Sequence, residues 1–200
     1  MRSRLDGGEG WSEGSSLEGS GSPVEDEGSL IERARSDESA FAELYERYVD
    51  RVFRYLRTHT ESEDDASDLT QHVFMQAFRA LPGYEHRKLP FSAWLIRIAR
   101  NAAIDTYRQR RRVMPWDHLS EQIVAFGTPT PEEAAIRRER MNEVRLLVAQ
   151  LSADEQELLA LRFAAGLTSK EIGELRGRTE AAVQKQLVRI MRRLKEKCSG

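Results

Sequence analysis

The chain of 200 residues is poor in the residue types on which most catalytic and metal sites depend. Its one cysteine, Cys198, cannot form an internal disulfide, which fits a reducing compartment. The four histidines are scattered and include no pair at positions i and i+4: His59, His72, His86 and His118. No glycine-rich phosphate loop follows a strand pattern. These absences predict no metal site, no cofactor and no enzymatic activity.

Long hydrophobic runs are also missing. No stretch of about 18 apolar residues occurs, so no membrane span is expected. The first residues lack the apolar centre of a signal peptide, which argues against secretion and predicts a cytoplasmic protein. Strand-like alternation is too short to indicate a sheet, and no repeat with a period of about 20 to 50 residues is present. The fold class predicted is therefore all-α.

Charge is present in quantity but segregated along the chain, although the formal net charge is only −2. Residues 37–70 hold ten acidic and four basic side chains. Residues 87–112 hold eight basic side chains against Asp105 alone, and residues 176–197 hold eight against Glu180 and Glu196. Two basic blocks in an otherwise acidic chain indicate two surfaces for a polyanion such as nucleic acid.

Composition divides the chain into four segments. Residues 1–28 are rich in Gly, Ser and Glu and are expected to form a disordered acidic tail. Residues 29–112 are predicted to form a first small helical domain, and residues 131–200 a second. Between them, residues 113–130 break the helical periodicity with Pro115, Gly127 and Pro129, and are predicted to be a flexible linker.

Helical periodicity and helix-start signals place three helices in the first domain. One apolar stripe recurs at spacings of three and four: Phe41, Leu44, Tyr48, Val52, Tyr55 and Leu56. Ser62 with Asp65 opens a second helix that ends at Pro82-Gly83. A third helix follows Pro90, with Phe91 and Trp94 on its inner face and a series of arginines along another side.

The stretch from Gly166 to Lys197 indicates a helix-turn-helix. Thr168 with Glu171 forms a capping box, Gly177 suits the turn, and Thr179 caps a longer basic helix. Val183, Leu187, Ile190 and Leu194 form its inner face. On its outer face Gln184 suits adenine and Lys185 suits guanine, whereas the arginines suit phosphates: Arg178, Arg189, Arg192 and Arg193. The second domain is therefore predicted to bind DNA in the major groove.

The chain as a whole resembles the extracytoplasmic-function sigma factors, the two-domain bacterial initiation factors of the sigma-70 family. The resemblance lies in residues 65–74 (DASDLTQHVF), 77–82 (AFRALP) and 91–101 (FSAWLIRIARN), followed by the arginine run. In the second half it lies in Leu151-Ser152 through Phe163, in Gly166-Leu167-Thr168, in Glu171-Ile172-Gly173 and in Val183. It covers about two thirds of the chain, in order.

The resemblance implies core RNA polymerase and promoter DNA as partners. Asp68, Leu69, Gln71 and Phe74 fall where the family binds the clamp helices of the polymerase, and the second domain would meet the flap. The −10 element would be held, selected and opened by one group of residues: Tyr84, Lys88, Arg97, Arg100, Asn101, Arg108, Arg110, Arg111 and Arg112. The −35 element would be read by another: Arg178, Thr179, Gln184, Lys185, Arg189 and Arg192. Many relatives are also held inactive by an anti-sigma factor, which is a further possible partner here.

Some positions depart from the family pattern. Ser67 and His72 stand where acids are usual, and Gln184 and Gln186 stand where bases are common. Tyr84, in a loop, is a better candidate than Phe91 or Trp94 for stacking on an unpaired base. Two other classes are the alternatives: a helix-turn-helix regulator whose first domain senses a ligand, and an enzyme. The acidic second helix with apolar Leu69 and Phe74 favours a protein partner over a sensed ligand.

Overall fold

The computed structural model describes residues 26–85, 88–110 and 143–198, together with the side chains of all of these except 107–110. Every regular element among them is helical, which confirms the predicted fold class. The first half holds α1 (Glu27–Ala34), α2 (Glu38–Arg57), α3 (Glu63–Ala80), the single turn η1 (Leu81–Gly83) and α4 (Phe91–Arg110). The second half holds a helical stretch at 143–149, α7 (Ala153–Leu159), the π-helical turn η2 (Ala160–Ala164), α8 (Ser169–Arg176) and α9 (Glu180–Cys198).

Polar caps start the helices where the sequence predicts them. The Ser62 side chain accepts a hydrogen bond from the backbone N–H of Asp65 at 3.0 Å and so begins α3. Ser152 with Glu155, and Thr168 with Glu171, form complete capping boxes at α7 and α8. Each cap satisfies backbone donors that the first helical turn leaves without a partner. The starts of these helices are therefore largely a local property of the sequence.

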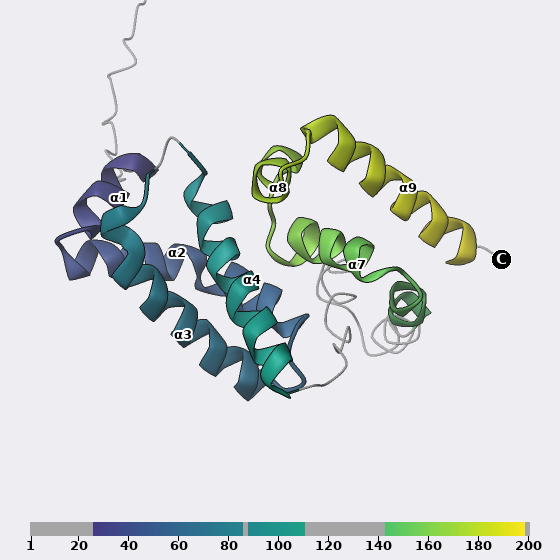
Figure 1. The fold of residues 1–200 in the computed structure, drawn as a ribbon, viewed down its shortest axis with the longest axis horizontal. Helices are drawn as coiled ribbons and strands as arrows, with labels where there is room; N and C mark the ends of the chain where they lie inside the picture. Colours follow the sequence, from purple (N-terminus) through teal and green to yellow (C-terminus); the bar gives the residue numbers. More distant parts are fainter. Residues whose placement is uncertain (1–25, 86–87, 111–142, 199–200) are drawn as a thin grey trace, which may run out of the picture.

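The first domain packs α1 to α4 around the apolar stripe of α2 (Figure 1). Leu44, Val52 and Leu56 are completely buried in this core. The first helix, α1, starts at Glu27, two residues inside the predicted tail, because Leu30 and Ile31 pack into the same core. Residues 1–25, the remainder of that tail, lie outside the described residues, and so does the predicted linker at 113–130.

The second domain packs α9 across α7 and α8 (Figure 1). The four predicted inner residues of α9, Val183, Leu187, Ile190 and Leu194, are all at most 9% exposed. They join a core that also contains Leu158, Leu161 and Ile172. The predicted helical face is confirmed.

The turn between α8 and α9 depends on two glycines, Gly173 and Gly177. Gly177 ends α8 in the left-handed conformation with φ of 65°, as predicted, where a residue with a Cβ atom would be strained. Gly173 lies so close to the turn that a Cβ atom would be 2.6 Å from the carbonyl oxygen of Arg178. The approach is backbone to backbone, so no side-chain rotation could relieve it.

The two domains touch each other, which the sequence did not predict. Helix α8 lies against α4 (Figure 1), and η2 lies against α2. Within the described residues, no helix is both long enough and apolar enough to cross a lipid bilayer.

The Gly173 contact predicts opposite outcomes for two glycine-to-alanine changes. Gly173→Ala should lower the free energy of unfolding of the second domain by about 1–3 kcal/mol, because the added methyl group forces the turn apart. Gly83→Ala is the matched control: a Cβ atom there has no neighbour within 4 Å. It should be neutral or stabilising by up to about 1 kcal/mol through the lower entropy of the unfolded chain. Urea unfolding followed by circular dichroism measures both, and equal stability of the two variants would contradict the tight-turn account.

Candidate nucleic-acid interface

The outer face of α9 presents hydrogen-bond donors to solvent at the positions predicted for base and phosphate contacts. Thr179 caps the helix, accepting from the backbone N–H of Ala182 at 3.2 Å. Gln184, Lys185, Arg189 and Arg192 are all exposed. Gln184 donates to Glu180 at 3.0 Å one turn earlier, and the Arg192 guanidinium lies 3.8 Å from Glu196. Both contacts are within the exposed helix surface and could be exchanged for DNA at little cost.

An acidic side chain holds the start of this helix in place. Asp154 on α7 accepts from Arg176 at the end of α8 and from Gln186 on α9, the latter at 3.3 Å. Arg178 donates to the Gln186 side-chain oxygen at 2.8 Å and lies 3.5 Å from Asp154. Burial disfavours the charged form of Asp154, yet these partners outweigh it and lower the pKa of its carboxyl group. The predicted DNA-contacting Arg178 is thus held in a defined position.

The first domain presents a second basic face along α4. Arg97 and Asn101 are exposed, and the Arg100 side chain is 41% exposed. Phe91 and Trp94 face inward and are at most 7% exposed, as their place on the inner stripe predicted. Arg108 and Arg110 belong to the last turn of α4, but their side chains lie outside the described residues, as do Arg111 and Arg112.

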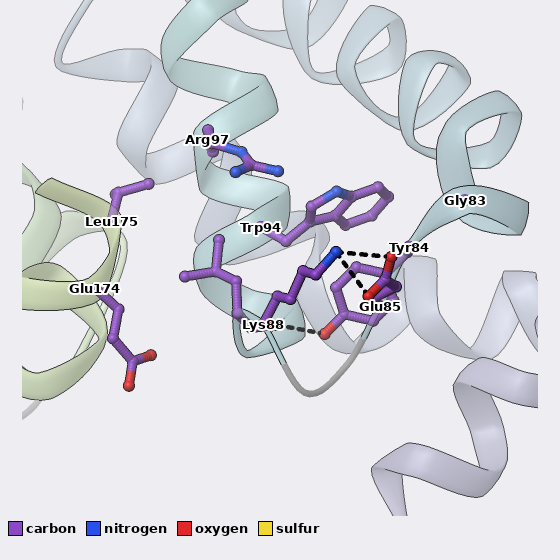
Figure 2. Close-up of a pocket in the computed structure, with 9 residues that line it drawn as sticks. Gly83, Tyr84, Glu85, Lys88, Trp94, Arg97, Glu174 and Leu175 are labelled. Atoms are coloured by element: carbon purple, nitrogen blue, oxygen red, sulfur yellow. Dashed lines mark hydrogen bonds and ion pairs between the residues drawn. The ribbon is translucent and has the colours of Figure 1, made fainter. Parts of the chain in front are cut away.

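Beside this face lies a cavity formed by the η1 turn, the loop after it and α4. It is lined by Tyr84, Lys88, Trp94 and Arg97, and across from them by Glu174 and Leu175 of α8 (Figure 2). Lys88 is exposed at its rim and donates to Glu85 at 2.9 Å. The cavity is therefore shared between the two domains, and the second domain covers one side of it.

The stacking role expected of Tyr84 requires correction. Its side chain is only 3% exposed, and its ring packs on Phe91 and on Trp94, with ring centroids 5.6 and 4.8 Å apart. Its hydroxyl donates to the Leu89 carbonyl at 2.7 Å, and burial raises its pKa to about 12. Tyr84 forms part of the cavity wall, and its ring belongs to the buried aromatic cluster with Phe91 and Trp94.

A buried carboxylate joins the two domains. Glu157 on α7, with a side chain only 12% exposed, accepts from the Tyr55 hydroxyl at 3.0 Å and from Arg100 Nε at 3.2 Å. The His59 ring lies 3.0 Å from its other oxygen. Burial alone would raise the pKa of Glu157, but the His59 hydrogen bond and charge, followed by Tyr55 and Arg100, lower it overall. Glu157 is thus held as a carboxylate.

Two further contacts flank Glu157 in the same interface. Arg51 of α2 donates to the carbonyl oxygens of Ala165 and Gly166, at 3.0 and 2.7 Å. Ser92 of α4 donates to Glu171 in a short hydrogen bond. Burial opposes ionisation of Glu171, yet Ser92 and Thr168 lower its pKa overall. These polar and charged contacts accompany apolar packing, since the buried apolar residues of the two domains belong to one core cluster.

The predicted polymerase-binding residues of α3 are only partly at the surface. Asp68 and Gln71 are exposed and Leu69 is half-buried, but Phe74 is 4% exposed and packs on Tyr45 with ring centroids 4.6 Å apart. Phe74 therefore supports this surface from below. The exposed large apolar side chains of α3 are Met75, at 55%, and Phe78, at 43%, which sequence reasoning missed. The one sequence signal for Met75 and Phe78 was that they are apolar residues at positions outside the buried stripe of α3.

Two family descriptions match the chain. "Sigma-70 region 2" matches residues 44–113 and "Sigma-70, region 4" matches residues 141–194. The curated relatives include the ECF RNA polymerase sigma factor BldN of Streptomyces coelicolor, 32% identical over 82% of this chain and 63% of BldN. They also include SigD of Mycobacterium tuberculosis, 31% identical over 84% of this chain and 81% of SigD. The chain thus spans a little under two thirds of BldN and about four fifths of SigD.

Solved structures share the fold. CnrH in complex with the cytosolic domain of CnrY is 24% identical, with a TM-score of 0.61 over 85% of this chain and 95% of that one. The sigma factor RpoE in complex with the anti-sigma factor NepR from Bartonella quintana is 20% identical, with a TM-score of 0.56 over 80% and 96%. The matched regions coincide with the two helical domains described above. The chain belongs to the ECF RNA polymerase sigma factors of the sigma-70 family, a family of non-enzymatic initiation factors.

Proposed function

We propose that this chain binds core RNA polymerase through its first domain and directs it to promoters with a −10 and a −35 element, so that transcription starts there. The observation that carries the proposal is the pairing of two exposed basic faces, on α4 and on α9, with an exposed apolar patch on α3. A DNA-binding regulator that acts without polymerase has no need of that patch. The chain would act in the cytoplasm, together with the polymerase.

The division of labour follows the two domains. Residues 29–112 bind the polymerase clamp helices and the −10 element, residues 131–200 read the −35 element and meet the flap, and residues 113–130 join them. The two matched sigma-70 regions fall within these boundaries except for residue 113. An anti-sigma factor is a further expected partner, since RpoE, a protein of the same fold, is bound to one in its solved structure.

The −10 element is assigned to the face of α4 and the cavity beside it. Arg97 and Asn101 are exposed on α4, and Arg100, which is partly exposed, contacts Glu157. All three side chains can offer donors to a single strand. Arg108 to Arg112 continue the same run of sequence and supply phosphate contacts. Lys88, at the cavity rim, is placed to contact a base that enters between the η1 loop and α4.

The −35 element is assigned to α9. Substitutions in this helix should distinguish the residues that contact bases from those that contact phosphates. Gln184→Ala and Lys185→Ala should each relax the preference at one or two neighbouring base pairs, at a cost of about 1–3 kcal/mol for the preferred site. Arg189→Ala should weaken all sequences about equally and reduce the salt dependence of binding by about one ion. Selection from a randomised −35 site, with the holoenzyme, measures the first effect, and titration at several salt concentrations measures the second.

The outcome against this assignment is equally definite. If both base-contact variants select the wild-type −35 sequence, α9 binds phosphates only and promoter choice lies in the first domain.

Substitutions in the proposed polymerase-binding surface of α3 should weaken binding to core polymerase and leave the protein folded. Leu69→Ala combined with Gln71→Ala, and separately Phe78→Ala, should weaken co-purification with core polymerase by about tenfold or more, as truncation of central interface side chains usually does. All three side chains are at least partly exposed, so urea unfolding should change little. Undiminished co-purification of both variants would mean that the clamp binds another surface.

A further inference from the structure

The first residue of α9 is an acid on a helix that is otherwise basic. The helix carries six basic side chains and two acidic ones, Glu180 and Glu196. Glu196 lies 3.8 Å from Arg192, whereas none of the ion pairs between described residues includes Glu180, which is exposed. A carboxylate on a face that meets DNA is repelled by phosphates. A favourable contact between Glu180 and DNA therefore has to be made with a base.

The hydrogen bond of Glu180 directs its side chain along the outer face of the helix. A carboxylate in the first turn stabilises a helix through the helix dipole wherever its side chain points. Here one carboxylate oxygen also accepts from the side-chain amide of Gln184 at 3.0 Å, one turn further on. The first residues of a recognition helix are the ones that meet base edges in the major groove. Glu180 is thus joined to the residue that the proposed function assigns to adenine.

This hydrogen bond leaves both side chains able to contact bases. The Glu180 carboxylate keeps its second oxygen as an acceptor, and the Gln184 amide keeps one N–H and its oxygen. The remaining groups of Gln184 match N7 and N6 of adenine. The remaining oxygen of Glu180 matches the N4 amino group that cytosine presents in the major groove. The two residues can therefore read two bases while they stay bonded to each other.

We infer that Glu180 is a further specificity-determining residue of α9, and that its carboxylate accepts a hydrogen bond from N4 of a cytosine in the −35 element. The inference rests on the proposed reading of this element by α9. The cytosine lies within two base pairs of the base that Gln184 contacts. Side chains at i and i+4 start about 5–6 Å apart, and successive base pairs are about 3.4 Å apart.

The other three bases do not suit a carboxylate, which can only accept hydrogen bonds. Guanine presents N7 and O6 and thymine presents O4, all of which are acceptors. Adenine presents a donor at N6, but its acceptor N7 stands beside it and repels the carboxylate. Glu180 therefore selects cytosine both by the contact it makes and by the contacts it disfavours.

Selection from a randomised −35 element, with holoenzyme made from the full chain and core polymerase, tests the inference. The wild-type chain should select cytosine at the position described. Glu180→Ala should reduce this preference by about tenfold, the usual effect of losing a good base contact. Glu180→Gln should select adenine there instead, because a carboxamide offers a donor to N7 and an acceptor to N6. Urea unfolding checks that both variants are folded.

Glu196→Gln is the matched control, since it removes the same charge from the other end of α9, where the side chain is also exposed. Losing a negative charge should raise the affinity for every −35 sequence a little in all these variants. The deciding measurement is therefore the selected base and not the overall affinity. Glu196→Gln should keep the wild-type −35 consensus.

The inference is overturned if the wild-type chain selects no cytosine within two base pairs of the Gln184 position, or if Glu180→Ala keeps that preference in full. Glu180 would then act only on the start of the helix. The proposed function is judged separately by Gln184→Ala and Lys185→Ala in the same selection. A relaxed consensus in these two with an unchanged one in the Glu180 variants refutes the inference alone. An unchanged consensus in all of them refutes the −35 assignment as well.

Discussion

The arrangement of this molecule depends on one carboxylate that one domain supplies and the other surrounds. A side chain such as Glu157, 12% exposed, is costly to keep charged unless donors compensate for the lost water, and here three do so from α2, the turn after it and α4. All three donors belong to the first domain, so they compensate the charge only while the domains touch. These bonds therefore act together with the apolar residues that the two domains bury in one core cluster.

The reading helix is fixed by a different set of contacts, all within the second domain. The close approach at Gly173 and the bonds from Asp154 to Arg176 and Gln186 hold the turn and the start of α9. Asp154 and Glu157 lie on the same helix, α7, so one short element both holds the start of α9 and contacts the first domain.

Local sequence signals predicted the helices and their inner faces. They could not predict contacts between residues that are far apart in the sequence. Caps such as Ser62 and Thr168 and the stripe on α9 are decided within a few residues, so periodicity and capping rules find them. The partners of Glu157 lie 102, 98 and 57 positions away, at Tyr55, His59 and Arg100, and no local pattern joins them. Likewise Phe74 and Phe78 are one turn apart on α3, and only the packing of α2 shows which of them is buried.

Charges that are separated along the sequence meet at one place in the fold. Arg97 and Arg100 belong to the basic segment at 87–112, and they lie beside Glu174 and Glu157 of the second domain. Arg100 Nε is 3.2 Å from the Glu157 carboxylate, so part of the charge of α4 is balanced inside the molecule. Lys185 and Arg189 on α9 are exposed, so the second basic segment keeps these charges at the surface.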